Sequence, residues 1–168
     1  GSFAQMNPPI RTVEHRDALR RGIQNGTIGI IATDHAPHTR EEKAQDYPIS
    51  PSGMPGLETS LAAMLTLRDT LGISLMQVSK IMSANAARIY GVKNRGSIAV
   101  GNYADLVLVD LKTTRTLNPQ KLFTKVAWSP FEGVPLTGWP VETWVNGVQV
   151  FAEGEITATH AAVEAQLL

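Results

Sequence analysis

The chain has 168 residues, with fifteen basic and fifteen acidic side chains and a formal net charge of zero at pH 7. No basic stripe or block of like charge is present, which argues against nucleic acid or an anionic membrane as a partner. No apolar stretch approaches the ~20 residues that a membrane-spanning helix needs. Cysteine is absent, so disulfides are excluded and a cytoplasmic location is expected. The length suits one or two small domains, whereas a barrel of eight strand–helix units needs roughly 250 residues.

The chain begins with a loop, a helix and an apolar run. Residues 5–12 are predicted to be extended, because their two prolines remove backbone donors and restrict their neighbours. A helix is predicted over residues 13–25, with Thr12 as its N-cap and Gly26 as its terminator. Residues 28–33 then have the composition of a fully buried strand.

The segment Thr33-Asp34-His35-Ala36-Pro37-His38 directly follows this run and is the most informative feature of the chain. A carboxylate at the C-terminal end of a buried strand lies at the edge of an α/β fold where catalytic groups are found. His38, four residues later, can reach the same edge. The neighbouring His35 would point the other way along an extended path, so we expect a structural role for it. With four histidines and no cysteine, a complete metal centre is hard to assemble. We therefore predict a catalytic piece that is separated from the rest of its site.

Helical patterns follow a polar loop. Residues 39–54 are predicted to be this loop, which has a length typical of functional or mobile segments. Polar caps and apolar spacing then indicate three helices, over residues 57–71, 75–82 and 84–90, with Ser74 and Ser83 as the later N-caps and Gly91 as the terminator.

After residue 95 the pattern changes to that of strands. One strand is predicted over residues 104–110, and residues 140–150 indicate a hairpin around Asn146-Gly147, the strongest short-range hairpin signal. The aromatic residues Trp128, Phe131, Trp139 and Trp144 are expected to pack within this part. We therefore expect an α/β unit over residues 1–95, a β-rich unit over residues 96–156 and a helical or frayed tail over residues 157–168.

Several stretches, in chain order, resemble the C-terminal part of dihydroorotase, a member of the amidohydrolase superfamily. These are residues 6–11 (MNPPIR), 31–38 (IATDHAPH), 42–43 (EK), 53–59 (GMPGLET), 96–110 and 128–131 (WSPF). The resemblance covers nearly the whole chain and implies a (β/α)8 barrel that carries a β-sandwich built from both chain ends. The fold class expected is therefore α/β: the C-terminal fragment of a metal-dependent hydrolase TIM barrel, with residues 28–33 as its last strand. Residues 96–156 would then be the C-terminal part of the small β-sandwich.

The resemblance also implies roles for individual residues. Asp34 resembles the family's catalytic carboxylate, which contacts the metal, accepts a proton from the metal-bound water and passes it to the leaving amide nitrogen. The metal would lower the pKa of that water and polarise the ring carbonyl. Asn7 and His38 resemble the groups that hold the carboxylate and the ring of the substrate. Their chemistry suits that role, because an amide and an imidazole can bind a small planar anion. Ser52 and Gly53 align with backbone positions that contact the substrate ring.

The family's other metal ligands are absent from this sequence. A His-x-His pair, a carboxylated lysine and two further histidines would lie upstream, and Lys43 stands in a loop after the Asp34 segment. Zn²⁺, as one or two ions, is therefore expected in a full-length parent, with none held tightly by this chain. Gly1-Ser2 is typical of a cleaved tag, so we expect a piece of a longer protein that is inactive alone.

The function that this resemblance implies is reversible hydrolysis of the cyclic amide of dihydroorotate to carbamoyl-aspartate in pyrimidine synthesis. One alternative is a related cyclic amidohydrolase such as allantoinase. Another is a non-catalytic dihydroorotase-like protein that scaffolds a partner such as aspartate transcarbamoylase. The expected partners are the small-molecule substrate and a second copy of the chain, because a strand taken from a closed barrel leaves apolar surface exposed.

Overall fold

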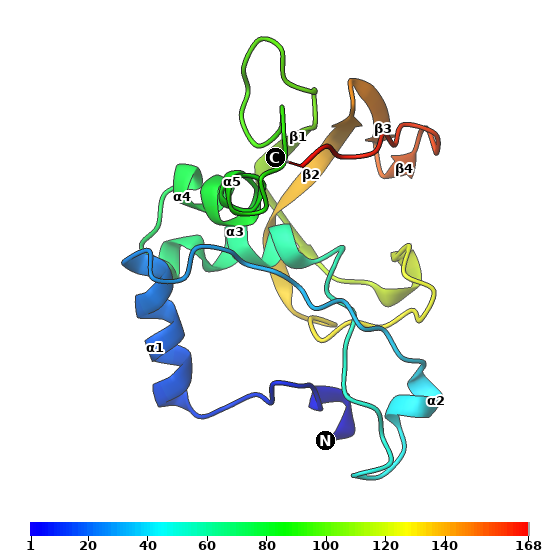
Figure 1. Ribbon diagram of the computed structural model, residues 1–168. Coiled ribbons are helices and arrows are strands. Elements are labelled where there is room, and N and C mark those ends of the chain that lie inside the picture. The colour runs from blue at the N-terminus through cyan, green and yellow to red at the C-terminus, as the bar shows by residue number, and fades with distance from the viewer. Residues whose placement is uncertain (168) are drawn as a thin grey trace.

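The computed structural model describes residues 1–167, which form a group of helices beside a small antiparallel sheet (Figure 1). The helices are α1 (Val13–Gln24), α2 (Arg40–Lys43), α3 (Ser60–Leu71), α4 (Leu75–Ser79) and α5 (Asn85–Ile89), with a π-helical turn η2 (Lys80–Ala84) between the last two. Short 3-10 helices are formed by η1 (Ser2–Ala4) and η3 (Pro119–Lys121). None of the helices in residues 1–167 is long and apolar enough to cross a bilayer.

The first helix agrees with its prediction to within one residue. Thr12 takes the extended N-cap conformation, but its hydroxyl lies 3.0 Å from Nδ1 of His15 and makes no bond to a helix N–H. The helix ends before Gly26, whose φ of +81° is one that glycine adopts freely. No residue of α1 is buried, so it packs only loosely on the rest of the chain.

Residues 28–33 differ from their prediction. They are extended, but they belong to no sheet of residues 1–167, and each is half-buried or exposed. Residues of the helical run supply hydrogen-bond partners for this segment instead. Ile31 N donates to Ile81 O at 2.9 Å, and Asn85 Nδ2 donates to Gly29 O at 2.8 Å. The prediction of a fully buried strand is wrong here, because a strand needs neighbouring strands and the described residues supply none at this position.

The loop predicted over residues 39–54 contains the short helix α2. Thr39 Oγ1 accepts from Glu42 N at 3.2 Å, and the Glu42 carboxylate accepts from Thr39 N at 2.8 Å. This reciprocal capping box satisfies two N–H groups that would otherwise lack partners. Its signature, Thr followed three residues later by Glu, is readable in the sequence, so the missed helix had a local signal.

The later helices are shorter and more continuous than predicted. Helix α3 begins at Ser60, three residues after the predicted start. Ser74 caps α4 through a second capping box with Gln77, which confirms its predicted role. Ser83 caps nothing, because it lies inside η2, and the two helices predicted over residues 75–82 and 84–90 form one helical run from α4 to α5.

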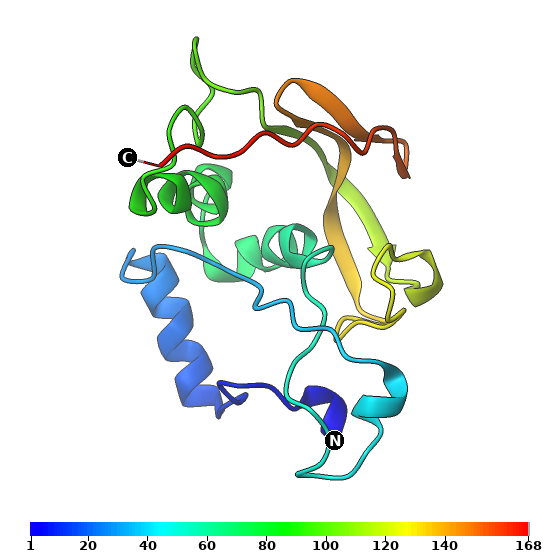
Figure 2. The same cartoon turned by 45° about the vertical axis from the view of Figure 1, so that its right-hand side comes forward.

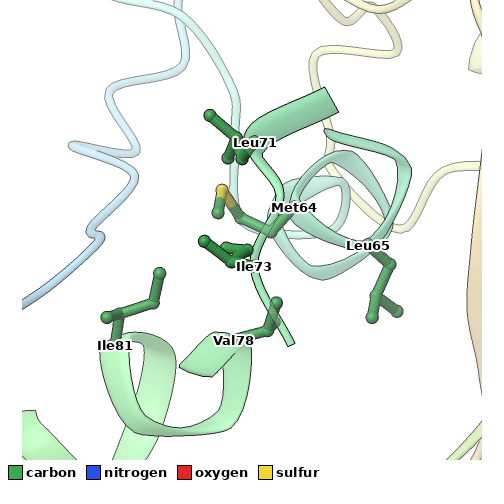
Figure 3. Packing of buried hydrophobic residues seen from close by; sticks show 6 residues of the cluster. All are labelled: Met64, Leu65, Leu71, Ile73, Val78 and Ile81. Atoms are coloured by element: carbon green, nitrogen blue, oxygen red, sulfur yellow. The ribbon is translucent and has the colours of Figure 1, made fainter. Parts of the chain in front are cut away.

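A compact apolar core joins α3 to this run. The side chains of Met64, Leu65, Leu71, Ile73, Val78 and Ile81 are each at most 8% exposed and form one cluster. Figure 3 shows the group between α3, the connection after it, and the start of the next helices. Burying side chains of this size contributes roughly 1.5–3 kcal/mol each. Ile31 packs against the same cluster, so the core also holds the segment that leads to Asp34.

The sheet is a simple antiparallel meander in the order β1-β2-β3-β4. Its strands are β1 (Leu106–Thr116), β2 (Pro135–Val145), β3 (Val148–Ala152) and β4 (Glu155–Ile156). The predicted hairpin is confirmed: Asn146 and Gly147 have φ of +52° and +81°, as a tight two-residue turn requires. The first strand runs six residues beyond its predicted end at Asp110.

The last described residues return to the helical part. Residues 157–167 contain no helix, so the helical alternative for the tail is wrong over this range, and Leu168 lies outside the described residues. Lys93 N donates to Gln166 O at 2.8 Å, and the amide of Asn146 donates to Ala161 O. Figure 2 shows this red trace passing from the sheet to the end of the helical run.

Candidate active site

Asp34 lies on an extended segment in an uncommon backbone conformation. Its φ is +45°, in the left-handed region that residues with a Cβ avoid, although Asp enters it more readily than most. The residue is exposed, and no described residue hydrogen-bonds to its carboxylate. Left-handed residues cost about 1–3 kcal/mol and cluster at functional sites. The carboxylate is thus presented to solvent with its acceptor positions open.

A second segment runs parallel to the Asp34 segment. His35 forms a parallel bridge with Met54, and Ala36 N donates to Met54 O at 3.2 Å. His35 Nδ1 accepts from Gly56 N at 3.1 Å and from Leu57 N at 3.2 Å. This ring nitrogen is therefore used as a backbone acceptor, which confirms the structural role expected for His35.

Gly53 brings the second segment close to His38. Its φ is +136°, and a Cβ placed on it would lie 2.6 Å from Ala36 O and 3.2 Å from His38 Cδ2. Only glycine fits this approach. The structure thus places Gly53 beside His38, and Ser52, the residue before Gly53, is exposed.

Trp128 also supports the backbone at His38. The indole Nε1 donates to His38 O at 2.7 Å, and the Trp128 ring meets Phe3 edge-on with centroids 5.2 Å apart. Trp128 is only 2% exposed. Trp128 therefore packs against the N-terminal segment and the Asp34–His38 segment, which the prediction of packing within the β-rich unit did not include. The His38 imidazole is half-buried, with Nδ1 3.6 Å from a Glu42 carboxylate oxygen.

Asn7 lies exposed in the N-terminal loop and is joined to Pro8 by a cis peptide bond. Two residues earlier, the Gln5 carbonyl accepts from Gly53 N at 3.0 Å. The loop that carries Asn7 is therefore tied to the loop that carries Ser52 and Gly53. No hydrogen bond joins Asn7 to Asp34 or His38 among the described residues.

Sequence reasoning missed Lys43, which is fully buried at the end of α2. Its Nζ donates to Gln5 O at 3.0 Å and to Pro51 O at 2.7 Å. The Gln5 side chain adds a bond from Nε2 to Ser50 O at 2.9 Å. Burial lowers the pKa of the Lys43 ammonium from its ordinary value. No local pattern signals this role, because the partners are backbone carbonyls that only the fold brings together.

The described residues do not by themselves fit a metal centre. Within residues 1–167, no group of three or more His, Cys, Asp or Glu side chains lies close enough together to hold an ion. Asp34 offers one carboxylate, while His35 Nδ1 accepts from two backbone N–H groups and His38 Nδ1 faces Glu42. A catalytic zinc site commonly takes three protein ligands, so further ligands would have to come from outside these residues.

A large cavity of the described residues lies away from Asp34. It has a volume of about 1340 Å³ and lies between the start of α3, the η3 loop and the sheet, with a mostly apolar lining. Glu58 closes one side, where its carboxylate accepts from Phe123 N at 2.9 Å and Thr124 N at 2.8 Å. None of the five predicted site residues lines this cavity. Asp34 therefore does not open into this cavity.

Comparison with known proteins places the chain in a family. The model of the amidohydrolase family matches residues 9–150, which is most of the chain. The chain therefore belongs to the amidohydrolase family, in agreement with the α/β content and the small antiparallel sheet.

Curated relatives and solved structures make this assignment more specific. The chain is 40% identical to dihydroorotase of Halobacterium salinarum, over 94% of this chain and 37% of that protein. It is 41% identical to dihydroorotase of Bacillus caldolyticus, over 89% of this chain and 35% of that protein. L-hydantoinase from Arthrobacter aurescens superposes with a TM-score of 0.86 at 32% identity, over 98% of this chain and 37% of that chain. The resemblance to dihydroorotase is confirmed, and the chain spans little more than a third of the length of these relatives.

Proposed function

We propose that this chain is the C-terminal part of a dihydroorotase. In this proposal residues 28–33 are the last strand of a (β/α)8 barrel, and residues 96–156 are the C-terminal share of a β-sandwich. The division into units over residues 1–95, 96–156 and 157–168 belongs to the same proposal. The whole protein would reversibly hydrolyse the cyclic amide of dihydroorotate to N-carbamoyl-aspartate in pyrimidine synthesis, in the cytoplasm.

One observation carries this proposal: an exposed carboxylate at the end of the 28–33 segment, in a chain about 40% identical to dihydroorotases. Asp34 would accept a proton from the attacking water and deliver it to the amide nitrogen as that group leaves. Its open acceptor positions support this role, because a carboxylate already bonded to backbone N–H groups is a weaker base. The family implies a metal cofactor, commonly zinc, whose remaining ligands would come from the rest of the whole protein.

The substrate would be held beside Asp34 by two loops. His38 and the exposed amide of Asn7 would bind the substrate carboxylate and ring, since imidazole and amide donors suit a planar anion. Ser52 and Gly53 would contact the ring through their backbone, and the close approach of Gly53 to His38 supports one shared site. The isolated chain is proposed to be inactive, because one carboxylate cannot hold a catalytic zinc ion.

A second candidate is a hydantoinase-type activity. The solved structures support it, since a D-hydantoinase from Thermus sp. has a TM-score of 0.88 over 95% of this chain, at 25% sequence identity. The higher identity to dihydroorotases favours the first candidate. Dihydroorotate, hydantoin and allantoin should therefore be compared as substrates of the whole protein, with dihydroorotate expected to have the highest kcat/KM.

The decisive variant is Asp34→Asn in the whole protein. Asn keeps the size of the side chain and also tolerates the left-handed backbone, but it cannot carry a proton. We expect kcat for dihydroorotate to fall at least ~100-fold, the usual contribution of general acid–base catalysis, with an unchanged melting temperature. Retention of the wild-type rate would refute the role of Asp34. Absence of turnover by the intact wild-type protein, with binding of aspartate transcarbamoylase, would favour the scaffold alternative.

A further inference from the structure

The buried ammonium of Lys43 lies where three segments of the candidate site meet. It is 0% exposed, at the C-terminal end of a helix of only four residues. Figure 1 shows α2, the N-terminal segment and the loop after α2 lying together at one end of the molecule. Two of its three N–H donors go to backbone carbonyls, those of Gln5 and Pro51.

Both acceptors stand next to residues proposed to bind substrate. Gln5 precedes Asn7 by two residues, and Pro51 directly precedes Ser52 and Gly53. The Gln5 carbonyl accepts from the Lys43 ammonium at 3.0 Å and from Gly53 N at 3.0 Å. One ammonium group therefore bridges the loop of Asn7 and the loop of Ser52 and Gly53, beside the bond from Gly53 N to Gln5 O.

Burying the Lys43 ammonium costs free energy, and packing alone does not require a charged group at this position. A buried ammonium loses its hydration, and none of the described carboxylates forms an ion pair with Lys43. Burial accordingly lowers its pKa. An apolar side chain of similar length could fill the same space without that cost. What it could not do is bond two carbonyls from different loops at once.

We propose that Lys43 is a positioning residue for the substrate-binding loops, holding Asn7 and Ser52–Gly53 at a fixed spacing around His38 without touching the substrate. This inference rests on the proposed function, because it concerns how the same site binds its substrate. Its consequence is that loss of the ammonium should loosen the two loops together and weaken substrate binding before it affects the proton transfer by Asp34.

The test is Lys43→Met in the whole protein, which keeps the length and packing of the side chain. We expect KM for dihydroorotate to rise about 10- to 100-fold, the scale on which loss of a well-held geometry acts, with a much smaller change in kcat. Amide hydrogen exchange at Gly53, whose N–H is bonded to Gln5 O, should accelerate at least ~10-fold. Lys43→Gln, whose shorter amide reaches one carbonyl at most, should give an intermediate effect on both.

The matched control is Lys80→Met, because Lys80 is an exposed lysine of η2 with no side-chain bond recorded among residues 1–167. It should leave KM and the exchange of Gly53 unchanged. Unchanged KM and unchanged exchange in both Lys43 variants would overturn the positioning role. So would faster exchange at Gly53 with a wild-type KM, since the loops would then move without consequence for binding. If wild-type protein does not turn over dihydroorotate, the proposed function fails, while the exchange measurement still decides whether Lys43 fixes the loops.

Discussion

Gly53 shows how a single backbone position controls the approach of two segments at the candidate site. A methyl group there would lie 2.6 Å from Ala36 O, closer than any real Cβ contact, and its φ of +136° already disfavours a side chain. The Ala36 carbonyl belongs to the backbone and cannot turn aside as a flexible side chain would. The segment that leads to His38 would have to move if Gly53 were replaced.

We therefore predict that Gly53→Ala lowers the free energy of unfolding of the whole protein by about 2–5 kcal/mol, from backbone strain and overpacking together. Gly133→Ala is the control, since Gly133 also has a positive φ of +76° but nothing lies within 4 Å of a Cβ there. It should cost only the strain, about 1–2 kcal/mol. Denaturant unfolding measures both, and equal losses would contradict a role for the Ala36 contact.

At this scale the sequence reveals residues that lie in local motifs better than residues whose role depends on distant partners. Asp34, Asn7 and His38 lie in motifs that can be read locally, and Gly53 lies in another. The roles of Lys43 and Trp128 were not predictable in the same way, because each depends on a carbonyl brought to it from a distant part of the chain. Every residue type has a backbone carbonyl, so a hydrogen bond to a backbone carbonyl cannot be recognised from the sequence of the partner residues.

At the scale of elements, Asp105 connects the start of β1 to the turn between β2 and β3. Its carboxylate accepts from Asn146 N at 2.8 Å and forms an ion pair with Arg95, whose guanidinium also donates to Asn146 Oδ1 at 2.7 Å. Burial raises the pKa of Asp105, but the bond from Asn146 N–H and the Arg95 guanidinium together outweigh it and leave the pKa below its ordinary value.

A pH dependence with a definite sign follows from the lowered pKa. Because the folded chain binds the Asp105 proton less readily than the unfolded chain, this carboxylate stabilises the fold fully above its ordinary pKa of 3.8. That contribution is lost as pH falls below 3.8 and through the lowered folded pKa. In Asp105→Asn, we expect a lower free energy of unfolding at pH 6 and a smaller decline towards pH 2. Parallel wild-type and variant curves from denaturant titrations would contradict this.

Local signals predicted elements well where one short segment determines the conformation. Asn146-Gly147 specifies its turn, and Ser74 specifies the start of α4, so both were found. The strand prediction for residues 28–33 was wrong because an apolar run indicates only that burial is favoured. It does not indicate which neighbouring strands would provide that burial. The break predicted near Ser83 failed for a related reason: its capping signal was overridden by packing of the continuous helical run on the core.

For the molecule as a whole, a notable feature is the solvent-exposed apolar surface over the sheet and its connecting loops. Val107, Phe123 and Ile156 line the large cavity and are 48%, 51% and 53% exposed. Apolar patches of this kind are uncommon on monomers and mark surfaces that associate. They agree with the expectation that a chain spanning about a third of its relatives lacks its usual neighbours.

We predict that the isolated chain self-associates, and that Ile156→Lys weakens this association by placing a charge in the apolar cavity. Val163→Lys serves as the control, since Val163 is similarly exposed, at 54%, but does not line the cavity. Size-exclusion chromatography with light scattering measures the mass of each. A wild-type mass of 18.2 kDa at all concentrations would contradict the prediction, as would equal weakening by the two variants.

The π-helical turn at Lys80–Ala84 has a consequence for how this part of the chain tolerates changes in length. A π turn contains one residue more than an α turn, and Asn85, which anchors the Gly29 carbonyl, begins directly after it. If the same residues were instead wound as a regular α-helix, Asn85 would be rotated by one residue's step, about 100°, around the helix axis. The anchor would then face away from Gly29. The π turn thus absorbs one residue while keeping Asn85 in phase, and a homologous chain with a regularly wound helix here would keep this anchor only if it were one residue shorter in the turn.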